Sequence, residues 1–462
     1  MNEIKLNERT HLLQEEPYSY QLQDVAEPNL MREFFEYTEI PKVSFNFRRS
    51  PYNMPENIWI TDTTFRDGQQ SREPYTVQQI VDIYKMISKL SGPNGIIRQT
   101  EFFVYSDRDR EAIEKCMDLR LKFPEITTWI RAKKEDFKLV HDIGVKETGI
   151  LVSCSDYHIF TKLGMTRRQA MEHYLSVIND AFEAGVVPRC HLEDITRADF
   201  YGFVVPFVRA IQKMSEQAKI PVKFRMCDTL GYGIPYVGTA LPRSVPGIVY
   251  GMQNYCDVPS EMLEWHGHND FYKAVANAAS AWLYGCASVN TTLFGIGERT
   301  GNVPMEAMVF EYAQLKGTLD GMDTTVITDL ARYYEKKIGF KVPPQTPFVG
   351  ENFNVTKAGI HADGLLKNEE IYNIFDTKKF LKRPPLVSLN QNSGAAGVAL
   401  WINESYGLEG EHRVGKHSPV VKYVKSWIDE QYANGRMSII SGKEVDKKID
   451  EFIASDMGTE GE

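Results

Sequence analysis

Short apolar runs alternate with segments of helical periodicity from residue 58 to about residue 318, and this alternation restricts the fold more than any other feature. The runs predict eight strands, at residues 58–61, 100–105, 127–132, 148–154, 186–193, 222–228, 262–268 and 288–295. Eight strands alternating with helices predict a closed parallel (β/α)8 barrel, a TIM barrel. A doubly wound open sheet is the alternative, but it would more often have fewer strands and a glycine-rich loop after the first one.

Two further regions flank the predicted barrel, which we place at residues 56–330. Residues 1–55 form an N-terminal arm that is richer in aromatic side chains than a disordered tail, so we expect it to pack on its own barrel or on a partner subunit. These aromatic residues are Tyr18, Tyr20, Phe34, Phe35, Tyr37, Phe45 and Phe47. The prolines of "GFKVPPQTPFVG" (339–350) predict a linker, so residues 331–462 should hold a linker, a lid and mostly helical C-terminal subdomains. Helices are expected near 394–404, 418–434 and 442–454.

Composition and charge argue against several functional classes. The formal net charge of −9 disfavours a general nucleic-acid binder, which needs many Lys and Arg side chains against phosphates. No apolar run approaches 18 residues and no basic flank precedes a hydrophobic stretch at the N-terminus, so we expect no membrane span, no signal peptide and a cytoplasmic location. The six cysteines show no CxxC spacing and are predicted to be reduced core thiols rather than zinc ligands.

Polar side chains follow the predicted strands at their carboxyl ends, where barrels hold catalytic groups. Asp62, Arg66 and Asp67 follow the first strand, and His266 and His268 end the seventh. Because alternate residues of a strand share a face, both imidazoles are expected to point inward. Two histidines and a carboxylate form a mixed site that suits Mn²⁺, Zn²⁺ or Fe²⁺, and hydrogen bonding inside the barrel is the alternative role for the histidines.

Two glycine-containing segments add candidate residues. "GIGERTGN" (295–302) lacks the Lys-Ser/Thr of a nucleotide P-loop, but it ends in Asn302, a candidate oxygen ligand for the same metal. In the C-terminal region, His361, Asp363 and Tyr372 lie in a polar stretch that is a poor core former. This stretch is either a solvated loop or a lid that brings acid-base groups to the barrel mouth.

Several motifs together resemble the signature of the DRE-TIM metallolyase family. This family includes the isopropylmalate, homocitrate and citramalate synthases, the Re-type citrate synthases and the hydroxymethylglutaryl-CoA lyases. The motifs occur in order over roughly residues 56–375 and are "DTTFRDGQQ" (62–70), "SDYH" (155–158), "EDITRAD" (193–199), "DTLGYGIP" (228–235), "HGHND" (266–270), "GIGERTGN" (295–302) and "AGIHADGLLKN" (358–368). The resemblance implies a metal-centred barrel, acetyl-CoA as co-substrate, and a divalent metal ion, with Mn²⁺ expected ahead of Mg²⁺, Co²⁺ or Zn²⁺.

The resemblance also implies roles for individual residues. Asp67, His266 and His268 are expected to bind the metal, with Asn302 at or beside it. Arg66 is expected to face the substrate carbonyl, with Asp62 bracing it, and the residues implicated in proton transfer are Glu193, His361 and Tyr372. The predicted substrate-binding residues are Arg66, Glu101, Arg131, His158 and Thr229, and for Arg131 a salt bridge within the barrel layers is the alternative.

The implied reaction is a Claisen-type condensation, in which a base takes a methyl proton from acetyl-CoA and the enolate attacks the carbonyl of a 2-oxo acid. The lyases of the family carry a cysteine in the loop after the eighth strand, and this loop has none. A biotin-dependent carboxyltransferase would need a lysine at the end of the fourth strand, where "LVSCSDYH" has none. A non-catalytic metal-binding scaffold protein is disfavoured by the complete set of metal and arginine residues.

The choice of 2-oxo acid depends on smaller differences. Phe294 and "LNQNSG" (389–394) depart from the isopropylmalate pattern, and few residues remain after the lid for a regulatory domain. "TTLFGIGER" is similar to the homocitrate form, yet "TEFFVYSDRDRE" (100–111) lacks the histidine expected for 2-oxoglutarate. The chain length and the aromatic arm resemble the Re-type citrate synthases, so we expect oxaloacetate as substrate, citrate as product, and a homodimer; homocitrate, isopropylmalate and citramalate synthesis are the alternatives.

Overall fold

The protein is described from a computed structural model that covers residues 5–10, 12–14, 19–40, 42–356, 359–438 and 440–459. The chain divides into two compact units, Met1–Asp323 and Thr324–Glu462. The second unit therefore begins a few residues before the boundary at 330 expected from the sequence. Within the described ranges, no helix is long and apolar enough to cross a membrane.

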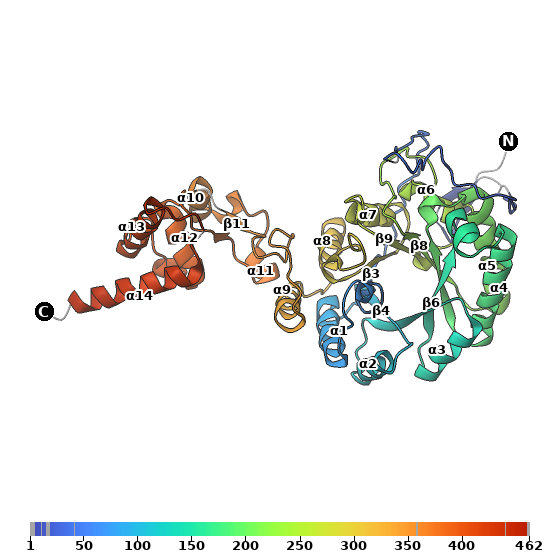
Figure 1. Cartoon of the computed structure of the whole chain (residues 1–462), viewed down its shortest axis with the longest axis horizontal. Helices are drawn as coiled ribbons and strands as arrows, with labels where there is room; N and C mark the ends of the chain where they lie inside the picture. The colour runs from blue at the N-terminus through green and yellow to red at the C-terminus, as the bar shows by residue number, and fades with distance from the viewer. Residues whose placement is uncertain are drawn as a thin grey trace. The chain divides into compact units, whose positions relative to one another are not determined.

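Eight parallel strands close into a barrel in the first unit, as predicted (Figure 1). The strands are β3 (Trp59–Asp62), β4 (Ile97–Phe102), β5 (Glu125–Ile130), β6 (Glu147–Ser153), β7 (Val187–Glu193), β8 (Lys223–Asp228), β9 (Leu263–Gly267) and β10 (Ser288–Thr291). Strands neighbour one another in chain order, and β10 pairs with β3 to close the barrel. β4 begins at Ile97 rather than at residue 100 because its first half includes Gln99, a polar residue that an apolar run does not reveal.

Helices connect the strands and surround them (Figure 1). They are α1 (Val77–Ser91), α2 (Asp107–Asp118), α3 (Phe137–Ile143), α4 (Arg167–Glu183), α5 (Val205–Ala218), α6 (Val245–Asn254), α7 (Ala274–Tyr284) and α8 (Met305–Lys316). Short 3₁₀ or π segments are η1 (Thr64–Gly68), η2 (Lys134–Asp136), η3 (Tyr157–Lys162), η4 (Ile195–Arg197), η5 (Phe200–Val204), η6 (Ser260–Met262) and η7 (Leu293–Gly295). The first connection shows how the sequence specifies a helix start, because Thr76 and Gln79 form a reciprocal capping box at the beginning of α1.

Charged side chains fill the middle of the barrel. Glu101 of β4 accepts hydrogen bonds from Arg189 at 2.6 Å and from Arg225 at 3.0 Å, and Arg225 also donates to Glu264 at 2.5 Å. All four side chains are buried, which is tolerated only because each charge is paired and hydrogen-bonded. The barrel interior is tightly packed around these side chains, because a Cβ atom on Gly149 of β6 would lie 2.5 Å from a ring nitrogen of His191. This packed network supports the polar residues at the strand ends.

The N-terminal arm packs on its own barrel, one of the two arrangements expected. A hairpin of β1 (Lys5–Asn7) and β2 (Leu12–Gln14) begins it. Tyr20 stacks on Tyr201 with ring centroids 5.0 Å apart, and Phe35 lies 5.7 Å from the ring of Tyr232. Tyr18 lies outside the described residues, whereas Tyr37 and Phe47 are largely exposed.

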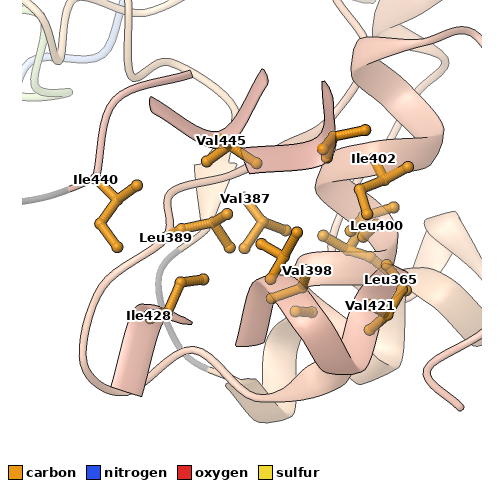
Figure 2. Close-up of a cluster of buried hydrophobic side chains, with 14 residues drawn as sticks. Leu365, Val387, Leu389, Val398, Leu400, Ile402, Val421, Ile428, Ile440 and Val445 are labelled. Atoms are coloured by element: carbon orange, nitrogen blue, oxygen red, sulfur yellow. The ribbon is translucent and has the colours of Figure 1, made fainter. Parts of the chain in front are cut away.

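The second unit is mostly helical and has its own hydrophobic core (Figure 2). Its elements are α9 (Val326–Tyr333), η8 (Tyr334–Ile338), β11 (Val355–Thr356), α10 (Gly359–Lys367), η9 (Glu369–Ile371), α11 (Thr377–Leu381), β12 (Leu386–Val387), α12 (Ala395–Ser405), η10 (Gly410–His412), α13 (Pro419–Ala433) and α14 (Gly442–Thr459). The three predicted helices are present as α12, α13 and α14. Leu365 of α10 packs in the core with Val398 of α12 and Val421 of α13, so the helix that carries His361 is anchored within this unit.

The cysteines behave as expected from their spacing. All six are buried thiols that form no disulfide, and each is at a described position.

Candidate active site

One carboxylate and two imidazoles converge at the carboxyl end of the barrel. Asp67 belongs to η1, which follows β3, while His266 is the penultimate residue of β9 and His268 lies just beyond the strand. The Nε2 atoms of the two histidines are 3.3 Å apart, and Asp67 Oδ2 lies 3.6 Å from the first and 3.8 Å from the second. All three residues are buried, and their ligand atoms lie close enough to hold one metal ion.

A chain of hydrogen bonds fixes which nitrogen of His266 faces this cluster. Glu264 is ionised, because the burial that would raise its pKa is outweighed by Arg225, and the pKa falls to about 2. Thr61 must therefore donate its hydroxyl proton to Glu264, so Thr61 Oγ1 accepts from Asn290 Nδ2 at 2.9 Å. The amide oxygen of Asn290 then lies 2.8 Å from His266 Nδ1, which must carry the proton. His266 Nε2 is left with its lone pair directed at the cluster.

The electrostatics of the histidines suit metal binding. Burial lowers the pKa of His266 to about 4 and also lowers the pKa of His268. Both rings are therefore neutral near pH 7, as imidazole ligands must be. Two neutral rings that face a carboxylate, with the outer nitrogen of His266 held by an amide, fit a first-row divalent ion.

Asn302 lies beside the cluster. Its Nδ2 donates to Asp67 Oδ2 at 2.5 Å, and an isolated bridge pairs its backbone with that of His268. Asn302 Oδ1 is buried without a hydrogen-bond partner among the described residues, so it remains available to a cation. Gly297 is needed here because a Cβ atom at that position would lie 1.8 Å from Asn302 Oδ1.

Arg66 is held next to the metal ligands. Its Nη1 donates to Asp67 Oδ1 at 2.8 Å and its Nε to Glu101 Oε2 at 2.7 Å. Burial would raise the pKa of Asp67, but Arg66 and the two histidines more than offset this effect and lower it, so Asp67 stays ionised. The guanidinium also lies over the ring of Trp129, 5.6 Å from its centroid.

Two predicted residues around Arg66 have positions different from those expected. Asp62 does not brace Arg66: it accepts hydrogen bonds from Thr64 and Thr100, because it faces away from the lumen at the end of β3. Glu101 braces the arginine instead. Glu101 was expected to bind substrate, and the structure places both of its oxygens against arginines in the barrel interior.

A second polar cluster lies at the ends of β6 and β7. Glu193 Oε2 is 3.0 Å from His158 Nδ1, Lys162 donates to Glu193 Oε1 at 3.0 Å, and Ser153 also donates to this carboxylate. Burial alone would raise the pKa of Glu193, but His158, Ser153 and Lys162 together lower it to about 2. Glu193 is therefore a carboxylate at neutral pH and can accept a proton. The structure thus brings the predicted residues Glu193 and His158 together.

Thr229 and Arg131 make contacts of a different kind. Thr229 Oγ1 accepts the backbone N–H of Asp194 at 2.9 Å, and the Thr229 carbonyl accepts from Arg299 at 2.6 Å. Thr229 thus joins the ends of β7 and β8 to the glycine-rich loop. Arg131 donates twice to Asp136, both times at 3.0 Å, and its side chain is 55% exposed. Arg131 therefore forms a salt bridge, but an exposed one beyond the end of β5 and not one within the layers of the barrel, where the alternative placed it.

His361 and Tyr372 lie together in the second unit. Their ring centroids are 4.5 Å apart, and Tyr372 is about half exposed. Gly364 permits this approach because a Cβ atom there would lie 2.7 Å from the Tyr372 ring. The sequence-predicted set is thus divided between the two units, with the metal ligands, Arg66 and Glu193 in the first and this ring pair in the second.

Three residues of the site were not predicted from the sequence. Lys162 contacts Glu193, Asn290 fixes His266, and Trp129 lies against Arg66. The strand register could have identified Asn290, which lies directly opposite His266 in the β9–β10 pair. Period-two alternation could have indicated Trp129, which is two residues after the inward-facing Thr127.

Comparisons with known proteins identify the relatives of this chain. A family model described as HMGL-like matches residues 57–333. The chain is 58% identical over 436 residues to a protein of Clostridium kluyveri named Citrate (Re)-synthase, and the match covers 94% of this chain and 96% of that protein. A protein of Syntrophus aciditrophicus with the same name is 54% identical, with 94% of this chain and 69% of that protein covered.

A solved structure supports the fold. The crystal structure of the HMG-CoA lyase from Bacillus subtilis matches with a TM-score of 0.50 and 17% identity, over 63% of this chain and 97% of that one. At this identity the likeness concerns the fold alone, and it agrees with the eight-stranded barrel.

Proposed function

The chain belongs to the HMGL-like family, as its motifs predicted, and we propose that it condenses acetyl-CoA with oxaloacetate and water to give citrate and CoA. The observation that carries the proposal is the position of Arg66, hydrogen-bonded to Asp67 beside two neutral, buried histidines. The choice of oxaloacetate is supported by the name Citrate (Re)-synthase that two relatives carry, both of them more than half identical to this chain.

The proposed reaction forms one carbon–carbon bond and breaks one carbon–sulfur bond. A base removes a proton from the methyl group of acetyl-CoA, the resulting enolate attacks the oxo carbon of oxaloacetate, and the oxo oxygen takes up a proton to become a hydroxyl group. Water then adds to the thioester carbonyl, the carbon–sulfur bond breaks, and the CoA thiolate takes up a proton. The release of CoA makes the overall reaction effectively irreversible.

Arg66 is suited to the step in which the oxo oxygen gains negative charge. Two of its nitrogens are fixed on Glu101 and Asp67, and the described residues provide no partner for its Nη2. A donor that is already oriented stabilises a developing oxyanion without further reorganisation. A divalent ion held by Asp67, His266 and His268, with Asn302 beside it, would act as a Lewis acid that polarises the same oxygen.

Proton transfer is proposed for Glu193, His361 and Tyr372. Glu193 is ionised at neutral pH, as a proton acceptor must be, and its Oε2 lies 3.0 Å from His158 Nδ1, so a proton can pass between the two side chains. The mutual packing of His361 and Tyr372 supports a joint role for this pair. His158 and Thr229 are proposed to help bind the oxo acid, since each lies against the Glu193–Asp194 segment.

The proposal includes three further points. Mn²⁺ is the proposed ion because the ligand set mixes imidazole nitrogen with carboxylate and amide oxygen. A homodimer is proposed from the family resemblance. A cytoplasmic location is supported by six cysteines that remain free thiols.

The test is release of free CoA from acetyl-CoA by the full-length protein with Mn²⁺ and, separately, oxaloacetate, 2-oxoglutarate, pyruvate and 2-oxoisovalerate. We expect oxaloacetate to react fastest and citrate to accumulate in a 1:1 ratio with CoA. The Asp67→Asn variant serves as the control for metal-dependent turnover. An inert oxaloacetate together with a reactive acid from the rest of the panel would show that the citrate assignment is wrong.

A further inference from the structure

We propose that Trp129 limits the length of the oxo acid that the site accepts, by closing the β4–β5 side of the lumen beside Arg66. The proposal rests on the proposed function, because it concerns the substrate of the same site. It assigns a specificity-determining role to a side chain that is not one of the candidate metal ligands.

The direction of the Trp129 side chain follows from its strand. Thr127 Oγ1 accepts a hydrogen bond at 3.1 Å from Arg189, which lies in the barrel interior. Residues two apart on a strand share a face, so Trp129 also points into the barrel, nearer to its carboxyl end. By the same reasoning Phe103, two residues after the inward-facing Glu101, points inward from the end of β4.

Phe103 and Trp129 form an aromatic wall across these two neighbouring strands. Their ring centroids are 5.7 Å apart and their planes meet at 87°, an edge-to-face packing. Both residues are partly exposed rather than fully buried, so the wall borders open space instead of the packed core. Rigid aromatic rings in this position set a boundary that a ligand cannot easily push back.

The wall is directly connected to the reaction site. The guanidinium of Arg66 lies 5.6 Å from the centroid of the Trp129 ring, and Arg66 Nη1 lies 2.8 Å from Asp67 Oδ1. One side chain therefore separates Trp129 from a candidate metal ligand. A substrate whose oxo oxygen faces Arg66 has the remainder of its carbon chain within reach of this ring.

The indole N–H adds a chemical preference to the steric one. Trp129 Nε1 is buried and has no hydrogen-bond partner among the described residues. The indole nitrogens of Trp265 and Trp282 are also buried and unpaired among the described residues, but neither faces the lumen. Trp265 lies between the inward-facing Glu264 and His266 and so points out of the barrel, and Trp282 lies on α7. An unpaired buried donor is costly, and a carboxylate oxygen would satisfy it. The second carboxylate of a short dicarboxylic oxo acid has the required chemistry.

The expected selectivity follows from size. 2-Oxoglutarate is one methylene longer than oxaloacetate, and one methylene in a tight pocket typically changes kcat/KM by about 10- to 200-fold. A smaller side chain at position 129 would provide space for that methylene and remove the indole donor. The preference for the shorter acid should then weaken or reverse.

The experiment compares the Trp129→Leu variant with the wild-type protein. For each, kcat/KM is measured with oxaloacetate and with 2-oxoglutarate by CoA release in the presence of Mn²⁺. We expect the ratio of the two values to fall at least about 10-fold in Trp129→Leu. The matched control is Trp59→Leu, because Trp59 also lies against an arginine, Arg98 at 5.1 Å, but at the amino-terminal end of β3. This control should keep the wild-type ratio.

The ratio separates the proposed role from simple support of Arg66. If Trp129→Leu loses activity equally with both acids, Trp129 only positions Arg66 and the proposal is overturned. If Trp129→Leu fails to fold, as judged by circular dichroism and Tm, the Trp129→Phe variant is measured instead. We expect a smaller fall in the kcat/KM ratio for Trp129→Phe. An unchanged ratio in that variant would contradict the proposal. If the wild-type protein prefers a different acid, the proposed function is wrong. The effect of Trp129→Leu is then tested on the kcat/KM ratio between that acid and its homologue that is longer by one methylene.

Discussion

His266 and His268 present their Nε2 atoms to each other at 3.3 Å, and both face Asp67 Oδ2. Two neutral imidazoles can share only one proton in such a contact, whereas a divalent ion satisfies both lone pairs and the carboxylate together. We therefore expect the purified protein to bind one divalent ion per chain, with a clear rise in Tm when Mn²⁺ is added to metal-free protein. The rise is measured by differential scanning fluorimetry and the stoichiometry by elemental analysis.

The variant that tests this site is His266→Ala. It should lose the bound metal, the Mn²⁺-dependent rise in Tm and CoA release, because only two of the three ligands remain. His141→Ala is the control, since that histidine is exposed on α3. Full metal content in His266→Ala would rule out this ligand set.

Asn290 should influence metal affinity without touching the ion. It holds the proton on His266 Nδ1 and so keeps Nε2 available to the cluster. Loss of such a partner typically costs about 10- to 100-fold in metal affinity or activity, and we expect this for Asn290→Ala. The Kd for Mn²⁺ is measured by titration calorimetry, with Asn179→Ala on the exposed face of α4 as the control. An unchanged Kd would mean that His266 needs no fixed tautomer.

The barrel itself could be predicted from the sequence because each strand contributes an apolar run and each is followed by a helical segment. The prediction was weakest where strands carry inward-facing charge. β4 includes Gln99 and Glu101, whose polar side chains are stable only because Arg189 and Arg225 reach them from the other side of the barrel. Such long-range pairing is not visible in a local pattern.

The candidate site shows the same limit. Asp67, His266 and His268 were identifiable because motifs and strand alternation specify them locally. The prediction that Asp62 braces Arg66 was wrong, because closeness in sequence does not show which face of β3 a residue occupies. Glu101, which does brace Arg66, is 35 residues away along the chain. The role of Trp129 likewise depends on a contact between two different strands.

Arg66→Ala should separate metal binding from turnover. The variant keeps Asp67 and both histidines, and Glu101 keeps its pairing with Arg189 and Arg225. Removal of one oxyanion donor typically costs on the order of 10²- to 10³-fold in kcat, and we expect a loss of that size with normal metal content. The control is Arg209→Ala, an exposed arginine on α5. Near-normal turnover in Arg66→Ala would exclude its proposed role.

The Glu193 cluster predicts a pH-dependent contribution to stability. Its pKa is lowered from 4.5 to about 2 in the folded protein, so the contribution is fully present above the unfolded-state pKa and is lost as the pH falls through the folded-state value. The difference in pKa corresponds to roughly 3 kcal/mol at neutral pH. Glu193→Gln removes the charge that His158 and Lys162 contact, and its Tm should lie below that of the wild-type protein at pH 7.

The sign of the effect is tested by repeating the comparison from pH 7 down to pH 3. Between pH 7 and pH 5 the difference in Tm between wild type and Glu193→Gln should stay constant, because Glu193 is ionised in both the folded and the unfolded wild-type chain. Below about pH 4.5 the difference should narrow, since the unfolded chain takes up a proton there while the folded one does not. Glu183→Gln, on the exposed side of α4, should follow the wild-type Tm throughout. A difference that widens on acidification would show that folding raises the pKa of Glu193 instead of lowering it, and would rule out the charge contacts of Glu193 as the source of the stability.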